Sequence, residues 1–255
     1  MIVSRPARKR LQLEIAVTSP RSARALIEQF GGRTEKLPRD WLKRFTRREE
    51  SKPLKIGRRL VISNMEGTLA SRRSRHKGRC HILVPASMAF GTGEHATTAM
   101  SLRLLEQLTR EWKNSWSLVD LGTGSGILAL AAKRLGAGRV AGVDIDPTAI
   151  LTAKANARLN KINDVDFQLE DLRKRKPAYK IDIGTANLYS QLLIEILPAL
   201  KRSRWLILSG ILRTQEKEFV RALSRSKIDI VKVRRRGQWI AVLAKTHLTG
   251  DAANG

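Results

Sequence analysis

The chain has 255 residues, of which 42% are hydrophobic, so it suits one large domain, or one domain with a small appendage, and global disorder is excluded. No apolar run is long enough to cross a membrane, and residues 1–10 lack the pattern of a secretory signal. The single cysteine, Cys80, excludes an internal disulfide and is typical of the reducing cytoplasm, where we expect the protein to act.

The formal net charge of +26 is unusual, and it is denser in the first third of the chain. Residues 1–88 carry a net charge of +15 and residues 89–255 carry +11. A field of this size attracts polyanions, which predicts a partner such as RNA. The alternative is a general bias toward arginine in the source's proteins, without any such partner.

The first ninety residues predict short elements separated by basic segments. Residues 1–10 are expected to form a basic arm, the alternating residues 11–17 a strand, and residues 19–32 a helix ended by two glycines. Residues 38–59 are very basic, with apolar residues at helical spacing. Two further strands are expected at 60–64 and 80–85, although a solvated linker is the alternative for this region.

Strands and helices alternate from residue 97 onward. Strands are expected at 117–122, 138–146, 165–171, 181–187, 205–210, 228–235 and 238–246, and helices at 97–112, 126–136, 146–160, 190–200 and 214–223. This order predicts an α/β fold with a seven-stranded, mostly parallel sheet, helices on both faces and an antiparallel edge hairpin. Such sheets bind ligands at the carboxyl ends of their strands.

The motif "LVDLGTGSGIL" places Gly122, Gly124 and Gly126 between a strand and a helix, with Asp120 before them. Glycines let the backbone approach a ligand closely, and the helix N-terminus offers free N–H groups. A dinucleotide fold favours G-x-G-x-x-G, whereas here the third glycine comes one residue earlier. This spacing, with an acid facing the ligand's cationic end, is typical of S-adenosylmethionine enzymes; the alternative is a tight strand–helix turn.

Acids and an amide end the following strands. Asp144 is placed to accept both ribose hydroxyls, whereas Asp146 is expected only to cap a helix. Asp171 is placed to accept from the exocyclic amine of adenine, a role for which Glu170 competes.

Asn187, at the end of the fourth strand, offers an amide oxygen that can hold a substrate amine in line with the sulfonium. Its neighbour Tyr189 either walls this pocket or packs into the core, and the core interpretation is favoured.

Five segments, "MAFGTGEHATT", "DLGTGSGILALAAKRLGA", "GVDIDP", "ANLY" and "LILSGIL", resemble in order the PrmA family, the lysine methyltransferases of large-subunit ribosomal protein eleven. The resemblance runs from about Met88 to Lys245. It implies a Rossmann-like class I methyltransferase fold and methyl transfer to lysine side chains and the terminal amine of a ribosomal protein. It also implies that "AFGTG" is a mobile loop over the methionine end of the cofactor, S-adenosyl-L-methionine.

Motif and resemblance together assign Asn187 to catalysis. Cofactor binding is assigned to Phe90, Gly91, Thr92, Thr98, Asp120, Gly122, Thr123, Gly124, Asp144, Ile145, Asp171 and Asn187. No metal is expected, because the four histidines are scattered and the lone cysteine cannot complete a cluster. A monomer is the expected state.

The chain departs from the family in its first part. The family's recognition domain is a complete small α/β domain joined by a flexible linker, but here one strand and one helix precede the "DWL" segment at Asp40. We therefore expect a truncated, basic α+β recognition piece at 1–37, a basic linker and small strands at 38–87, the methyltransferase domain at 88–246 and a tail at 247–255. The basic N-terminal region is the expected contact with the ribosome or RNA.

Two other functions remain open. An RNA methyltransferase fits the charge, and "NLYS" is weakly similar to the Asn-x-x-aromatic strand end of amino-methylating nucleic-acid enzymes, although Leu188 and Tyr189 replace the two prolines usual there. A non-catalytic protein that binds cofactor and RNA is the third interpretation. Retention of Thr98, Asp144 and Asn187 together disfavours it.

Overall fold

The computed structural model describes residues 2–4, 12–14, 24–25, 27–29, 31, 53–64, 78–85, 95–174 and 180–247. The chain divides into two compact units, residues 1–49 and residues 50–255. In the first unit β1 (Ile2–Ser4) pairs antiparallel with β2 (Gln12–Glu14), and residues 24–25 and 27–29 are helical. The predicted strand and helix agree with this. The prediction of a basic arm over residues 1–10 is wrong at β1, because strand pairing depends on backbone hydrogen bonds rather than side-chain charge.

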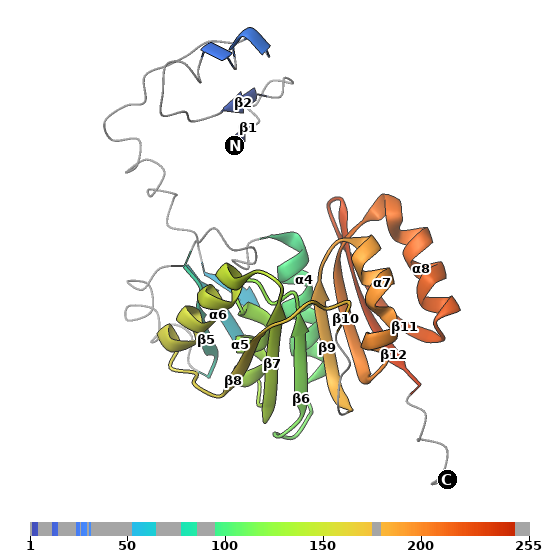
Figure 1. The fold of residues 1–255 in the computed structure, drawn as a ribbon. Helices are drawn as coiled ribbons and strands as arrows, with labels where there is room; N and C mark the ends of the chain where they lie inside the picture. Colours follow the sequence, from blue (N-terminus) through green and yellow to red (C-terminus); the bar gives the residue numbers. More distant parts are fainter. Residues whose placement is uncertain are drawn as a thin grey trace. The chain divides into compact units, whose positions relative to one another are not determined.

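The second unit contains two sheets and five α-helices in the described residues (Figure 1). Its elements are β3 (Leu54–Ile56), β4 (Leu60–Ser63), β5 (Cys80–Leu83), α4 (Ala96–Leu108), β6 (Ser117–Leu121), α5 (Ile127–Arg134), β7 (Arg139–Asp144), α6 (Pro147–Leu159), β8 (Val165–Leu169), β9 (Ile181–Asn187), α7 (Ser190–Leu200), β10 (Ser203–Leu212), α8 (Glu216–Arg225), β11 (Ile228–Arg236) and β12 (Trp239–Thr246).

The large sheet has the strand order β11-β12-β10-β9-β6-β7-β8. Its strands from β10 to β8 run parallel, and β12 is antiparallel to both of its neighbours. The predicted seven-stranded sheet with an antiparallel edge hairpin is therefore confirmed. Because both faces of its central strands are covered, those strands are continuous apolar runs in the sequence.

Helices cover the two faces of this sheet in separate layers. One hydrophobic cluster joins α4, α5, α6 and the small sheet to one face, and the other joins α7 and α8 to the opposite face. The helix ends follow ordinary capping chemistry. The Asp146 carboxylate accepts a 2.8 Å bond from the Thr148 N–H at the start of α6, with Pro147 at its first position, as the sequence predicts.

The small sheet, ordered β3-β4-β5, belongs to the same compact unit as the large one. Strands were expected at β4 and β5 but not at β3. The three residues of β3 lie in a lysine-rich segment and are too few to show an alternation of apolar and polar residues. Buried Asn160, at the end of α6, holds Leu83 of the small sheet through its side-chain amide. Its Oδ1 accepts from the Leu83 N–H at 2.8 Å, and its Nδ2 donates to the Leu83 carbonyl at 2.7 Å. Buried Glu106 on α4 holds the small sheet through Arg59. Burial raises the pKa of Glu106, but hydrogen bonds from Arg110 and Arg58 bring it below its ordinary value.

No helix in the described part of the chain is long and apolar enough to span a membrane.

Candidate active site

The ends of four parallel strands, β6, β7, β8 and β9, meet along one edge of the large sheet, which we call the carboxyl edge (Figure 1). Leu121 at the end of β6 pairs with Val143 on one side and with Ala186 on the other. The predicted residues Asp120, Asp144 and Asn187 are each adjacent to one of these aligned positions. The fold therefore brings together side chains that are up to 67 positions apart in the sequence.

The glycine loop turns the chain sharply between β6 and α5. Gly122, Gly124 and Gly126 all have positive φ angles, of 71°, 53° and 80°, which disfavour residues that carry a Cβ. The N–H groups of Gly122 and Thr123 donate to the Val143 carbonyl at 2.8 and 2.9 Å. The loop is thus fastened to the end of the next strand.

Asp144 is partly exposed at the end of β7, and its carboxylate is oriented by two backbone N–H groups. Oδ2 accepts from Gly124 at 2.9 Å, and Oδ1 accepts from Asp146 at 3.1 Å. Each carboxylate oxygen can accept more than one bond. The side chain therefore retains acceptor capacity for a pair of hydroxyl groups.

Asp120 differs from Asp144, because it is only 1% exposed. Its Oδ2 accepts from the Thr123 hydroxyl and its Oδ1 from the Thr185 hydroxyl, each at 2.7 Å. Burial raises its pKa to about 6, although both hydrogen bonds act in the opposite direction. Asp120 is thus a buried charge beneath the glycine loop, and it shares that loop with Asp144.

Asn187 ends β9 and contacts the first turn of α4. Its Nδ2 donates to the hydroxyl of buried Thr98 at 3.2 Å. Its Oδ1 is buried and has no hydrogen-bond partner among the described residues. A buried acceptor without a partner is costly, so this oxygen is suited to accept an N–H from a ligand.

Large apolar side chains are exposed along the same edge. Ile145 after β7 is 62% exposed and Leu169 at the end of β8 is 59% exposed. Tyr189 beside Asn187 is 55% exposed, so the favoured interpretation that it packs into the core is wrong. The residue starts α7 at its N-cap, where the chain leaves the sheet and the ring is not covered. The flat base of a nucleoside can pack against exposed apolar side chains of this kind.

Asp171 lies beyond the end of β8 and is partly exposed. Its Oδ1 accepts from the Arg173 N–H at 3.0 Å, and the Arg173 guanidinium lies 3.8 Å away. The Glu170 N–H donates to the Asp144 carbonyl at 3.0 Å, so the two strand ends are joined there. Phe90, Gly91 and Thr92 lie outside the described residues, so the predicted loop over the cofactor remains a prediction.

Two residues of the site were missed by sequence reasoning. Thr185 pairs in register with Asp120 and donates to it, and the signal was a polar residue inside the otherwise apolar strand 181–187. Leu188 lies against the glycine loop, since a Cβ on Gly122 would come within 2.4 Å of Leu188 Cδ2. No sequence pattern indicates that contact.

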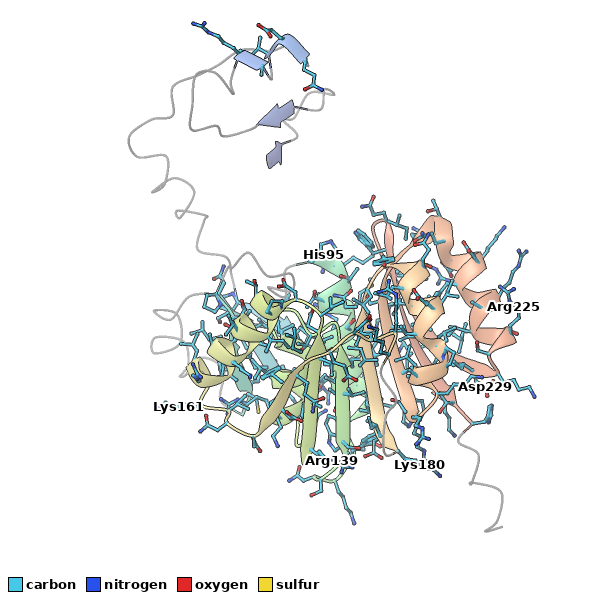
Figure 2. The ribbon with its side chains drawn as sticks, viewed as in Figure 1. His95, Arg139, Lys161, Lys180, Arg225 and Asp229 are labelled. Atoms are coloured by element: carbon cyan, nitrogen blue, oxygen red, sulfur yellow. The ribbon has the colours of Figure 1, made fainter. Side chains whose placement is uncertain are left out.

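His95 stands at the carboxyl edge, at the start of α4, whereas Arg139 and Lys180 lie at the opposite edge (Figure 2). Its ring lies 5.2 Å from that of Trp239 in an edge-to-face contact, and its Nδ1 is 2.7 Å from the Thr97 hydroxyl. Burial lowers its pKa below the ordinary value. The residue was left out of the predicted catalytic set, and it links α4 to the β11–β12 hairpin.

Solved structures share this architecture. A ribosomal protein L11 methylase from Lactobacillus delbrueckii subsp. bulgaricus is 29% identical and superimposes with a TM-score of 0.64, over 76% of this chain and 99% of that chain. A putative RNA methyltransferase from Pyrococcus horikoshii, 16% identical with a TM-score of 0.52 over 61% of this chain and 86% of that one, shares the fold alone. The predicted Rossmann-like class I methyltransferase fold is confirmed.

Curated relatives support the same grouping. Ribosomal protein L11 methyltransferases from Dictyoglomus thermophilum and Pelobacter propionicus are 32% and 36% identical to the chain, over 81% and 75% of its length. The chain spans 66% and 62% of those two proteins, which is less than two thirds of their length. The family model described as ribosomal protein L11 methyltransferase (PrmA) matches residues 22–247. The chain therefore belongs to the PrmA family.

Proposed function

We propose that this chain is an S-adenosylmethionine-dependent methyltransferase that methylates amines of a ribosomal protein, at a lysine side chain or the N-terminal amine, in the cytoplasm. The observation that carries the proposal is the buried Oδ1 of Asn187, which has no hydrogen-bond partner in the described part of the chain and is held beside Thr98 at the carboxyl edge. The family membership supports the substrate class.

The carboxyl edge fits the cofactor on the chemistry of its donors and acceptors. S-adenosylmethionine supplies an electrophilic methyl group on a sulfonium when it is bound. In the proposal Asp144 accepts the ribose hydroxyls, Ile145 and Leu169 face adenine, and Asp171 accepts from the adenine amine. The glycine loop leaves room for the close approach of the ligand.

The cationic end of the cofactor needs negative charge, which the chain as a whole lacks. Asp120 supplies a carboxylate directly beneath the loop, and Thr123 and Thr185 hold both of its oxygens. A nearby positive charge favours the ionised form of a buried acid. We therefore infer that cofactor binding lowers the pKa of Asp120 from its raised value.

Asn187 positions the methyl acceptor. Because the Thr98 hydroxyl accepts from Nδ2, the amide has one fixed orientation, and Oδ1 is left to accept an N–H from the substrate amine. The amine must be neutral to use its lone pair, and the positive field of the chain favours the neutral form. The proton that the nitrogen loses passes to water. Catalysis is then mainly positioning, without a general base.

The N-terminal unit supports no finer assignment of the substrate. Residues 1–37 are proposed as a substrate-recognition piece, and contact of this basic region with the ribosome or RNA stays a prediction. The region at 38–87 was expected as a linker with small strands, and β3, β4 and β5 lie in the compact unit of residues 50–255. The monomeric state also stays a prediction.

A labelling experiment separates the proposal from its alternatives. The full chain is incubated with tritiated S-adenosylmethionine and ribosomal subunits, and the products are digested with nuclease or with protease. We expect label that survives nuclease and is lost with protease, and we expect Asn187→Ala to incorporate it much more slowly than the wild type. Label lost with nuclease would instead establish an RNA methyltransferase. Tight cofactor binding with no label on either material would favour the non-catalytic interpretation.

A further inference from the structure

Four basic side chains gather on one side of the large sheet, away from the carboxylates of the candidate site. They are Lys232, Arg234 and Arg236 of the edge strand β11, and Arg103 of α4. We call this set the arginine face. Its three strand residues alternate, so they point to the same side of the sheet.

Strand register identifies that side. Lys232, Arg234 and Arg236 pair with Leu243, Ala241 and Trp239 of β12, and these three residues pack in the hydrophobic cluster that contains α4. The intervening Val233 and Arg235 pair with Val242 and Ile240, which belong to the cluster of α7 and α8. The Lys232 Nζ also lies 3.5 Å from the Gln107 Oε1 of α4. The arginine face therefore looks toward α4.

The arginine face borders a hollow of about 320 Å³. Its lining consists of Ala99, Met100, Arg103, Arg234, Arg235 and Arg236. Ala99 and Met100 directly follow Thr98, the residue of α4 that contacts Asn187.

The cations of the arginine face have no carboxylate partners among the described residues. Arg235 also borders the hollow, but its side chain reaches the other side of the sheet, where Nε donates to Glu216 at 3.0 Å. By contrast, the Nε atoms of Arg103 and Arg234 are buried and without a described partner. The Arg103 Nη2 donates to the Lys55 carbonyl at 3.5 Å, which is a neutral partner. Like charges held together repel, so guanidinium groups without a described carboxylate partner are stabilised when an anion binds.

We propose that the arginine face binds the phosphate backbone of RNA. Arginine forks match phosphate oxygens in a bidentate manner. Alternate residues of a strand are about 6.8 Å apart, so the three β11 cations form a line rather than converging on one small anion. A line of cations fits a run of backbone phosphates, and the net charge of +26 favours a polyanion.

Cations on an edge strand also have a simpler role, since they prevent pairing with another sheet edge. That role requires solvated charges and no particular ligand. It predicts that loss of these cations promotes aggregation and leaves RNA binding unchanged, so the two roles are distinguishable.

Fluorescence anisotropy of labelled poly(U) RNA tests the proposal with the full chain. The variant is Arg234→Gln combined with Arg236→Gln, which removes two charges and keeps polar side chains. The matched control is Arg221→Gln combined with Arg225→Gln on the opposite layer, where both arginines are exposed and Figure 2 shows Arg225 on α8. Both proteins lose the same net charge, so a difference between them reports the position of the charges.

We expect the β11 variant to bind poly(U) on the order of tenfold more weakly at low salt, and the α8 control to remain near wild type. The dependence of log affinity on log salt should become shallower by about 1.4, because each single-strand phosphate contact contributes about 0.7. Equal losses in the two variants, or an unchanged salt slope in the β11 variant, would overturn the proposal.

Two further readings complete the test. Polyglutamate is added as competitor, and equal displacement by polyglutamate and by unlabelled poly(U) of the same charge would show a surface for acidic protein and disprove the RNA assignment. Methyl transfer to the isolated ribosomal protein should be unchanged in the β11 variant, because neither altered residue belongs to the residues assigned to the cofactor or to the methyl acceptor. Failure of the RNA binding therefore leaves the proposed enzyme activity untouched, and the reverse also holds.

Discussion

The carboxyl edge and the β11 strand of the arginine face belong to one sheet but have opposite charges. Asp120 lies near the end of β6, and Asp144 is the last residue of β7. Arg234 and Arg236 lie on β11, the outermost strand. A cationic donor and a polyanionic partner need different surroundings. The strand order keeps these surroundings apart, with β9, β10 and β12 between β6 and β11. The predictions below test whether the two regions are as separate as this arrangement implies.

The largest effect concerns the buried charge of the carboxyl edge. The folded chain holds the Asp120 proton up to a pKa of about 6, whereas the ordinary value is 3.8. Without cofactor, this group should therefore lower the free energy of unfolding by about 3 kcal/mol as the pH rises through that window, and should have no effect below it. Urea denaturation across this range measures the dependence.

Asp120→Asn should remove this dependence on pH, because the amide does not ionise. Thr185→Val should extend the window upward, because it deletes a hydrogen bond that favours the ionised form. Parallel pH curves for the wild type and Asp120→Asn would contradict the burial of this charge.

The next effect concerns positioning of the amine. Asn187→Ala should reduce the single-turnover rate of methyl transfer about 100-fold, because the acceptor that orients the substrate is lost. The affinity for S-adenosylmethionine should change by a smaller factor than this rate. Asn187→Asp keeps an oxygen acceptor and should lose less activity than the alanine variant. The Arg234→Gln, Arg236→Gln variant should retain the wild-type rate, and a loss there would mean that the two regions act together.

Two neighbouring acids distinguish ligand binding from helix capping. Asp144→Ala should weaken S-adenosylmethionine binding by ~1–3 kcal/mol, measured by calorimetry, because polar partners are left unpaired. Asp146→Ala should instead lower the free energy of unfolding by about 1 kcal/mol through loss of the α6 cap, with cofactor affinity unchanged. Unchanged cofactor binding in Asp144→Ala would place the ribose elsewhere.

The smallest effect compares a glycine of the glycine loop with a glycine of the turn between β11 and β12. Gly122 and Gly237 both have positive φ angles, of 71° and 58°, so alanine at either strains the backbone. A Cβ at Gly237, in the β11–β12 turn, meets no atom within 4 Å, but one at Gly122 meets Leu188. Gly122→Ala should therefore cost about 1 kcal/mol more in chemical denaturation. Leu188→Ala should recover that difference, and equal costs without it would show that Leu188 yields freely.

Most of the fold was predictable because its signals are local. Alternating apolar strands and capped helices predicted the seven strands of the large sheet, and Asp146 and Pro147 marked the start of α6. The failures were short strands, β1 and β3, whose three residues carry too little periodicity. The burial of Tyr189 was predicted wrongly, because the exposure of a side chain at the start of a helix depends on whether another part of the chain packs over it.

The sequence by itself determined the α/β class, the antiparallel hairpin and the strand ends where Asp144 and Asn187 stand, because periodicity and motif spacing are written along the chain. Only the tertiary structure decided that Thr185 bonds Asp120, that Thr98 orients Asn187 and that Arg103 joins the cations of β11. Thr185 is 65 positions from Asp120, Asn187 is 89 from Thr98, and the β11 cations are at least 129 from Arg103. Strand order and helix packing bring such residues together, and a linear pattern does not contain that information.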